Sequence, residues 1–475
     1  MTDVSRLAKR IAHGVGWRTR RLWRSLPFSE NRRRQPRRTR EAKGAGKKPS
    51  IYSRTSRENL YDGIEFLRNR AVVDAHQNVV MQLRTRLDSD STAQISVAFV
   101  VSSAARWNAG RLFDLMNEHP RFSPKVVLFP PHFPGVEQAE RTSEFLAQER
   151  FFRSIDANLS VHYELDADET LPIEDLDADV VFLEMPWGMK DFPRRLTGRA
   201  LPVYMHYGFM VMANHEMHYN VASFHSYLWS YYTQTEGHRR LHLEHDPSAE
   251  ERIVVTGYPK LDVYDPGHLF DDDPWASSGL EAHPRIIYAP HHSLGADNLG
   301  MSTFAWSGDA VAHLRAKYPS TTWLYKPHPG LRFAVARNGL MSLDEYDEYA
   351  RTWEEGPRSF SMTAGDYFAH FRTSDALITC SGSFLAEYLP TGRPIIWLLS
   401  DQTVGLNRVG MRFSEGYYMV RTAEELHDVF VDVVINGNDP LASTRAALAQ
   451  ELFPLGYSAS SAIISHLEGE LLPSW

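Results

Sequence analysis

This chain alternates regularly between short apolar runs and segments long enough to form a helix, and this alternation determines the class of fold that it can adopt. The first group of runs is rich in β-branched residues and lies at 95–101, 125–129, 180–183, 202–205 and 253–255. Continuous apolar runs of this length are typical of strands that are buried on both faces. Strands that alternate with helices form a parallel sheet, so this part of the chain predicts a doubly wound α/β lobe.

A second group of runs follows an Asp- and Pro-rich stretch at 265–274, which we interpret as a linker. These runs lie at 285–288, 322–325, 376–379 and 394–399. With 475 residues, the chain is too long for one ordinary hydrophobic core. We therefore predict an α/β fold with two doubly wound, Rossmann-like lobes that face a cleft. The N-terminal lobe is expected over 51–265, and the C-terminal lobe, with terminal helices, over 275–475.

The first 50 residues differ in charge from the rest of the chain. They hold 16 Lys and Arg residues against 3 Asp and Glu, whereas the remainder holds 35 against 56. A basic arm joined to an acidic body suggests that the arm has a partner of its own. Because residues 3–26 mix basic and apolar side chains, we predict that residues 1–50 form a partly amphipathic or disordered arm that docks on an anionic membrane surface. A solvated tail and contact with nucleic acid are the alternatives, and we expect no nucleic acid.

Two further features bear on the compartment. The single cysteine, Cys380, excludes an internal disulfide and agrees with a reducing environment. No stretch reaches 18 consecutive apolar residues, and the N-terminus lacks the apolar core of a secretory signal. We therefore expect a cytoplasmic protein that lies on the inner face of the cell membrane.

The densest group of candidate site residues follows a predicted strand of the C-terminal lobe. Lys326, Pro327, His328 and Pro329 come directly after the run at 322–325. The lysine supplies a fixed cation, the histidine supplies a titratable donor, and the two prolines keep the loop stiff. A diphosphate group needs donors of this kind. The alternative is a structural turn with a solvated lysine and a hydrogen-bonded histidine.

A second loop joins the run at 376–379 to a short helix through Ser381, Gly382 and Ser383. Small hydroxyl residues and a glycine at a strand-to-helix turn expose backbone N–H groups, which predicts an anion site. Glu387, about one turn into the helix, is placed to accept hydrogen bonds from ribose hydroxyls. The alternative is ordinary capping of the helix by the serines, with a solvated Glu387.

Histidines follow two other predicted strands. His291 and His292 come after the run at 285–288 and are expected to face the cleft or each other. They leave a metal site as an alternative, but no carboxylate stands at ligand spacing nearby, so we predict no metal. In the N-terminal lobe, His206 follows the run at 202–205, where a general base would face the cleft. A buried, structural histidine is the alternative for His206.

Taken together, these motifs resemble one family, the CDP-glycerol:poly(glycerophosphate) glycerophosphotransferases of teichoic-acid and capsule polymer synthesis. The resemblance covers roughly residues 200–400 and is carried by six motifs in the same order. The motifs are His206 with Gly208, then 255–262, 288–293, 326–329, 365–368 and 374–388. The chain departs from the family at three points. Lys326 replaces an arginine, Cys380 replaces an aspartate, and Phe209 with the two residues after it stands where Thr-Pro usually follows.

The resemblance implies a two-lobed glycosyltransferase-B fold with the donor nucleotide on the C-terminal lobe, attachment to the membrane surface, and transfer without a metal or cofactor. It also implies that His206 is the base for the acceptor hydroxyl and that His328 contacts the donor diphosphate. Ser381 and Ser383 match the serines of the family's phosphate loop.

The same resemblance implies the reaction. We expect transfer of a glycerol-phosphate or related polyol-phosphate group from a CDP-linked donor to a hydroxyl of a cell-surface polymer or its lipid-linked precursor. A glycosyltransferase that uses a nucleotide-sugar is one alternative. An inactive nucleotide-binding scaffold in a polymer-synthesis complex is the other.

Overall fold

A computed structural model describes residues 56–130, 138–156, 158–164, 169–215, 221–265, 273–276, 279–280, 282–295, 299–363, 367–454 and 456–472. The predicted arm of residues 1–50 lies outside these ranges, as do residues 365 and 366 of the motif at 365–368. The chain divides into two units, and the unit Leu67–Trp475 contains both of the large sheets described below. Among the described helices, none is both long enough and apolar enough to span a bilayer.

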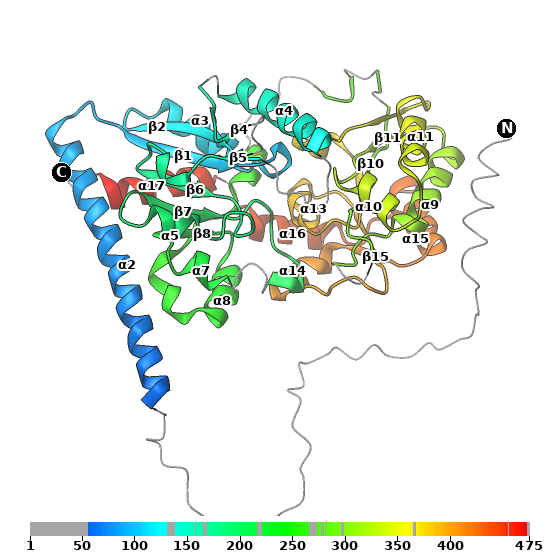
Figure 1. The fold of residues 1–475 in the computed structure, drawn as a ribbon. Coiled ribbons are helices and arrows are strands. Elements are labelled where there is room, and N and C mark those ends of the chain that lie inside the picture. Colours follow the sequence, from blue (N-terminus) through cyan, green and yellow to red (C-terminus); the bar gives the residue numbers. More distant parts are fainter. Residues whose placement is uncertain are drawn as a thin grey trace, which may run out of the picture. The chain divides into compact units, whose positions relative to one another are not determined.

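The N-terminal lobe is built on a seven-stranded parallel sheet with the order β3-β2-β1-β6-β7-β8-β9 (Figure 1). Its strands are β1 (Ile95–Val101), β2 (Phe122–Leu128), β3 (Ser160–Val161), β6 (Val180–Leu183), β7 (Leu201–Met205), β8 (Ser230–Thr233) and β9 (Ile253–Val255). A small antiparallel pair, β4 (Tyr163–Glu164) and β5 (Glu169–Thr170), lies apart from this sheet. The strand order reverses between β1 and β6, and ligands of such sheets bind at this switch point.

The C-terminal lobe repeats the plan with a six-stranded parallel sheet in the order β12-β11-β10-β13-β14-β15. Its strands are β10 (Arg285–Ala289), β11 (Thr322–Tyr325), β12 (Ser359–Ser361), β13 (Ala376–Thr379), β14 (Ile395–Leu398) and β15 (Tyr418–Val420). Here the order reverses between β10 and β13. The two sheets confirm the predicted α/β fold with two doubly wound lobes.

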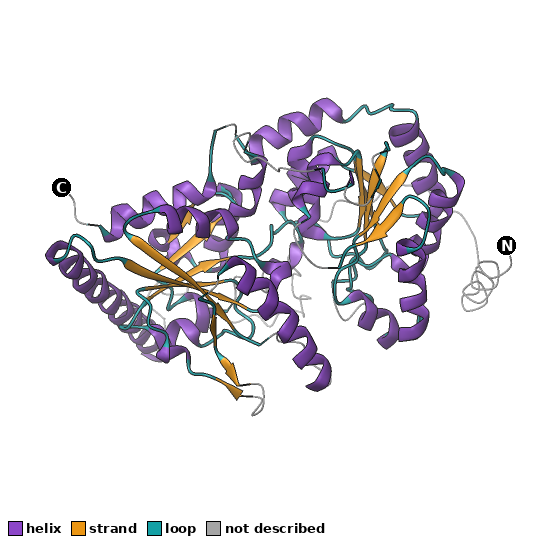
Figure 2. Ribbon diagram, turned by 90° about the horizontal axis from the view of Figure 1, so that it is seen from above, coloured by secondary structure: helices purple, strands orange, loops and turns teal. Residues whose placement is uncertain are grey.

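Helices cover both faces of each sheet (Figure 2). Those that precede the linker are α2 (Ser56–Ser89), α3 (Gly110–Glu118), α4 (Gln138–Ile155), α5 (Phe192–Leu196), α7 (Ala222–His225) and α8 (Glu236–His245). Those that follow it are α9 (Phe304–Lys317), α10 (Leu331–Arg337), α11 (Leu343–Glu354), α12 (Phe368–Thr373), α13 (Gly382–Glu387), α14 (Arg408–Phe413), α15 (Ala423–Val429), α16 (Ala442–Leu452) and α17 (Ala459–Leu471). The segment Phe430–Ile435, after α15, is a π-helix.

The alternation of side chains along the central strands explains why the runs are apolar throughout. In β1, Val97 and Phe99 belong to one buried cluster, whereas Ala98 and Val100 belong to another on the opposite face. Strand β10 divides its side chains between two clusters in the same way. A strand covered on both faces has no polar side, as the sequence predicted.

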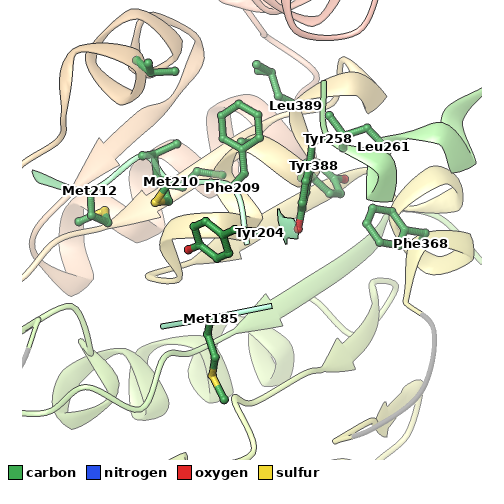
Figure 3. Close-up of a cluster of buried hydrophobic side chains, with 14 of the residues drawn as sticks. Met185, Tyr204, Phe209, Met210, Met212, Tyr258, Leu261, Phe368, Tyr388 and Leu389 are labelled. Carbon is green, nitrogen blue, oxygen red and sulfur yellow. The ribbon is translucent and has the colours of Figure 1, made fainter. Parts of the chain in front are cut away.

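One of these clusters is shared by the two lobes. It includes Phe209 and Met210 from the N-terminal lobe, Tyr388 and Leu389 from the C-terminal lobe, and Tyr258 from the segment that joins them (Figure 3). Burial of one continuous apolar surface holds the two sheets together, because apolar area removed from water stabilises a contact at about 25 cal/mol per Å².

The last helix differs from the expected arrangement. We placed the terminal helices with the C-terminal lobe, within 275–475. Helix α17 instead packs on α3, and Ile463, Leu467 and Leu471 lie in the cluster on the outer face of the N-terminal sheet. Asp262, in the joining segment, accepts hydrogen bonds from the backbone N–H groups of Ala459 and Ser460 at the start of α17. The chain therefore returns to its first lobe at the C-terminal end.

Candidate functional site

A cavity of about 440 Å³ lies between the lobes, where the carboxyl ends of the strands meet. All nine residues that the sequence singled out line it: His206, His291, His292, Lys326, His328, Ser381, Gly382, Ser383 and Glu387. They follow β7, β10, β11 and β13, so parallel strands from two sheets bring them together. Two Rossmann-like lobes around a shared cleft constitute the glycosyltransferase-B type of fold.

Three histidines form a tight group on the C-terminal wall of the cavity. The ring centroids are 3.9 Å apart for His292 and His328, 4.3 Å for His291 and His292, and 5.1 Å for His291 and His328. Burial lowers the pKa of His292 to about 4, with further lowering by the positive charges of Arg337 and Arg106. Burial also holds the pKa values of His291 and His328 well below 6.5. All three imidazoles are therefore neutral at physiological pH.

Hydrogen bonds to the backbone fix where two of these neutral rings carry their proton. The Nδ1 atom of His328 accepts from the N–H of Gly330 at 3.0 Å. The Nδ1 atom of His291 accepts from the N–H of Ser293 at 3.2 Å and lies 2.8 Å from the Ser293 hydroxyl. An imidazole that accepts at Nδ1 carries its proton on Nε2. Each ring is therefore a hydrogen-bond donor at Nε2.

By distance alone, the three histidines also fit a metal ion, because their nitrogens lie within 4.8 Å of one another. Two observations make an anion the better ligand. The proton that Gly330 assigns to Nε2 of His328 occupies the lone pair that a metal would need. In addition, the charges of Arg106 and Lys326 act on His328 and would repel a cation. The donor set matches a phosphate more closely.

Lys326 adds a fixed positive charge to this wall. It follows β11, its side chain is buried, and its Nζ lies 4.9 Å from the centroid of the Tyr367 ring. Lys260, from the segment that joins the lobes, lies 5.1 Å from the centroid of the same ring. Both lysines line the cavity, although the sequence pointed to Lys326 as a ligand and not to Lys260. The Tyr367 ring thus makes cation–π contacts with two lysines at one side of the cavity.

The serine loop lies where the sequence predicted, between β13 and α13. The backbone N–H of Ser381 donates to the Thr379 hydroxyl at 2.9 Å, and the Ser381 side chain makes no capping hydrogen bond to α13. Gly382 lies close to the other lobe, because a Cβ atom there would be 2.9 Å from Cγ of Met212. The loop is therefore pressed against the N-terminal lobe.

Glu387 is not placed as expected. We predicted that it accepts hydrogen bonds from a ribose, or that it is solvated. It is buried, and its two oxygens accept from the hydroxyls of Tyr258 at 3.0 Å and Tyr367 at 2.5 Å. Lys260 lies 3.9 Å from the same carboxylate, and the Tyr258 hydroxyl also contacts the backbone oxygen of Tyr207. Glu387 therefore bonds the joining segment to the C-terminal lobe, and Tyr258 extends this contact to Tyr207 of the N-terminal lobe.

His206 lies on the opposite wall, directly after β7. Its Nδ1 is 2.6 Å from the carbonyl oxygen of Gly208 and 3.0 Å from the N–H of the same residue, and the shorter contact assigns the ring proton to Nδ1. The side-chain amide of Gln234 donates to the same carbonyl at 2.6 Å. Burial lowers the pKa of His206 to about 4. In this tautomer the lone pair of the neutral ring is on Nε2.

Arg106 is a cavity residue that the sequence analysis missed. It ends the short 3-10 segment Ala104–Arg106 that follows β1, and its Nη1 donates to the Ser102 hydroxyl at 2.7 Å. Glu184 lies 3.6 Å from the same nitrogen, and the guanidinium lies 5.6 Å from the centroid of the Tyr207 ring. Its position at the end of a central strand was the one sequence signal that could have found it.

The segment that follows His206 is bonded to the C-terminal lobe. The side chain of Asn407 donates to the carbonyl of Met210 at 2.7 Å, and its backbone N–H donates to Val211 at 2.9 Å. The N–H of Ala213 donates to the carbonyl of Gly405 at 2.6 Å. These contacts, which we call the interlobe strap, join residues 210–213 to residues 405–407.

Solved structures include proteins of similar fold. UDP-GlcNAc 2-epimerase from Neisseria meningitidis, bound to UDP-GlcNAc, is 14% identical with a TM-score of 0.49, over 79% of this chain and 100% of that chain. HepE of Anabaena, in complex with UDP-glucose, is 12% identical with the same TM-score and coverage. The UDP-GlcNAc 2-epimerase from Methanocaldococcus jannaschii is 11% identical, with a TM-score of 0.46, over 79% of this chain and 99% of that chain. No family model matches the chain, and no curated protein matches it.

Proposed function

We propose that this chain is a transferase that moves a glycerol-phosphate or related polyol-phosphate group from a CDP-linked donor to a hydroxyl of a cell-surface polymer or its lipid-linked precursor. One observation carries the proposal. A neutral histidine that can accept a proton, His206, and a wall of phosphate-type donors face the same cavity from different lobes. The motifs shared with glycerophosphotransferases supply the identity of the donor.

The C-terminal wall suits the diphosphate of such a donor. The Nε2–H groups of His291 and His328 and the ammonium of Lys326 are three donors around one cavity, and the first two are held in place by backbone contacts. Hydrogen bonds from fixed donors to an ionised phosphate are about twice as strong as those between neutral groups. Because the donors are already oriented, little reorganisation is needed as charge develops on the leaving phosphate.

The transfer step follows from the placement of His206. The oxygen of the acceptor hydroxyl attacks the phosphorus next to the polyol, and the bond from that phosphorus to the oxygen bridging it to CMP breaks. The acceptor proton passes to Nε2 of His206, and CMP leaves with the bridging oxygen and its electron pair. Lys326 and His328 stabilise the charge that appears on this leaving group.

The low pKa of His206 is compatible with this role. A pKa of about 4 keeps the ring unprotonated in the free protein, as a base must be. A bound diphosphate brings negative charge close to the ring, and a nearby opposite charge raises the pKa of an imidazole. Donor binding therefore strengthens the base at the moment at which it is needed.

A nucleotide-binding panel with product analysis tests the proposal. Thermal shifts with CDP, CMP, UDP and GDP, each with and without EDTA, should be largest for CDP and unchanged by EDTA. Incubation with CDP-glycerol and an acceptor should release CMP and form a phosphodiester. Preference for UDP, with release of a nucleoside diphosphate and a new glycosidic bond, would instead establish a glycosyltransferase. Binding of CDP without turnover of any donor would indicate an inactive scaffold. Loss of the CDP-induced thermal shift in EDTA would indicate that the three histidines bind a metal ion.

A further inference from the structure

We propose that Arg106 is a phosphate ligand supplied by the N-terminal lobe, which binds the donor diphosphate opposite Lys326 and so completes an anion site that neither lobe holds alone. This inference rests on the proposed function, because it assigns a contact to the diphosphate of the donor. It concerns a residue that none of the shared motifs includes.

The fold places Arg106 where a ligand would meet it. Strand β1 is the strand at which the order of the N-terminal sheet reverses, and Arg106 lies just beyond its carboxyl end. Strand ends at this position form the binding crevice of open parallel sheets. Arg106 accordingly lines the same cavity as His291, His292 and His328.

The guanidinium is held in place before any ligand arrives. The Ser102 hydroxyl accepts from Arg106 Nη1 at 2.7 Å and donates to Oε1 of Glu184 at 2.8 Å, so it links the two charged groups. The ring of Tyr207 supports the guanidinium from one side and stacks on His206, with centroids 4.7 Å apart. A cation fixed in this way loses little further freedom on binding. The same stack places it close to the base.

Arg106 keeps a positive charge directed at the opposite wall. Its charge lowers the pKa values of both His292 and His328, although these residues belong to the other lobe. Glu184 forms an ion pair with Arg106 in which the nearest nitrogen and oxygen are 3.6 Å apart. Burial moreover raises the pKa of Glu184, against the influence of Arg106. An anion in the cavity would be attracted from both sides.

The chemistry of phosphoryl transfer favours an arginine at this point. During transfer, charge spreads over the oxygens of the phosphorus under attack. A guanidinium presents parallel N–H groups that match two such oxygens, whereas an ammonium acts as a single point charge. Lys326 supplies such a point charge from one lobe, and Arg106 places a guanidinium at the same cavity from the other.

Binding of inorganic pyrophosphate to the full chain tests the inference without nucleoside or acceptor. Isothermal titration should show that Arg106→Gln weakens pyrophosphate binding about tenfold or more, as does Lys326→Gln, because each removes a charged partner of a phosphate. Arg106→Lys, which keeps the charge, should fall between wild type and Arg106→Gln. Arg111→Gln, at an exposed arginine of α3, is the matched control and should bind pyrophosphate as wild type does.

The outcomes separate this inference from the proposed function. Wild-type pyrophosphate affinity in Arg106→Gln, with weakened affinity in Lys326→Gln, would overturn the role of Arg106 and leave the proposed reaction standing. A lowered melting temperature of ligand-free Arg106→Gln with unchanged affinity would likewise assign Arg106 a purely structural role with Glu184. Pyrophosphate binding that depends on Arg106, in a protein that releases no CMP from CDP-glycerol, would support the ligand role and refute the reaction. If Arg106→Gln does not fold, the comparison of Arg106→Lys with wild type decides in the same way.

Discussion

Acid should destabilise this protein through its buried neutral histidines. Burial lowers the pKa values of His76, His206 and His292 to about 4, and that of His242 to about 2. The ordinary value in an unfolded chain is 6.5. Below about pH 6.5 these histidines therefore bind protons in the unfolded chain but not in the folded protein. Stability is fully present above this pH and is lost as the pH falls toward the folded pKa values.

The size of the effect follows from these pKa values. At about pH 5.5, a histidine with an unfolded pKa of 6.5 and a folded pKa of about 4 favours unfolding by about 1.4 kcal/mol relative to about pH 8. The four histidines together give about 5–6 kcal/mol, which is comparable with the whole stability of an ordinary domain. Glu184 and Asp262 act in the opposite direction, because burial raises their carboxyl pKa values.

The variant His76→Gln isolates one histidine from all other titrating groups. His76 lies on α2, is 4% exposed, and its pKa is lowered by burial and by the charge of Arg252. We measure the free energy of unfolding in urea by tryptophan fluorescence, for wild type and variant, at about pH 8 and about pH 5.5. Lowering the pH should reduce this free energy by about 1.4 kcal/mol less in the variant than in wild type. An equal difference between variant and wild type at both pH values would refute a neutral, buried His76.

Three other predictions concern the packing of Gly410 on the interlobe strap, the two candidate catalytic histidines, and the pH dependence of turnover. In Gly410→Ala, the new Cβ would lie 2.2 Å from the carbonyl oxygen of Val211, so we expect a loss of about 1–3 kcal/mol in the free energy of unfolding. The matched variant Gly405→Ala meets no atom within 4 Å and should stay within about 0.5 kcal/mol of wild type, and equal losses would contradict the close approach at Gly410. His206→Ala and His328→Ala should each lower turnover at least about a hundredfold while keeping a cooperative melt, and a near wild-type rate would remove that residue from the mechanism. In wild type, kcat should fall as the pH falls through the pKa of His206 in the donor complex, which lies above the free value of about 4, and a midpoint below the free value would exclude His206 as the base.

The sequence predicted the central strands well because both faces of each strand are buried. The runs at 180–183, 322–325 and 376–379 coincide with β6, β11 and β13. Of the strands in the two large sheets, it missed β3, β8, β12 and β15. Strand β8 reads Ser-Tyr-Tyr-Thr, so its hydroxyl groups conceal in the sequence a strand that is fully buried. The other three have two or three residues each and form edges of their sheets. Short runs of this kind carry no periodic signal.

The sequence predicted those residues of the candidate site that come directly after a strand. Parallel strands all deliver their carboxyl ends to one edge, so residues far apart in sequence could be placed together without knowing the lobe packing. The partners of Glu387 could not be found in this way. Tyr258 and Lys260 precede it by more than 120 residues, and the role of the carboxylate depends on how the joining segment folds back. Contacts between separate lobes leave no local pattern.

Gln234 explains physically why Met210 can stand in the loop after Gly208. In the family that the motifs resemble, Thr-Pro usually follows the glycine, and a proline has no N–H. Here the N–H of Met210 donates to Oε1 of Gln234 at 3.3 Å, and the other end of that amide donates to the carbonyl of Gly208, which is also the partner of His206 Nδ1. Gln234 can hold the loop at both ends because residue 210 is not a proline. The carbonyl of Met210 meanwhile accepts from Asn407, so the loop that orients the candidate base is bonded directly to the lobe that would hold the donor.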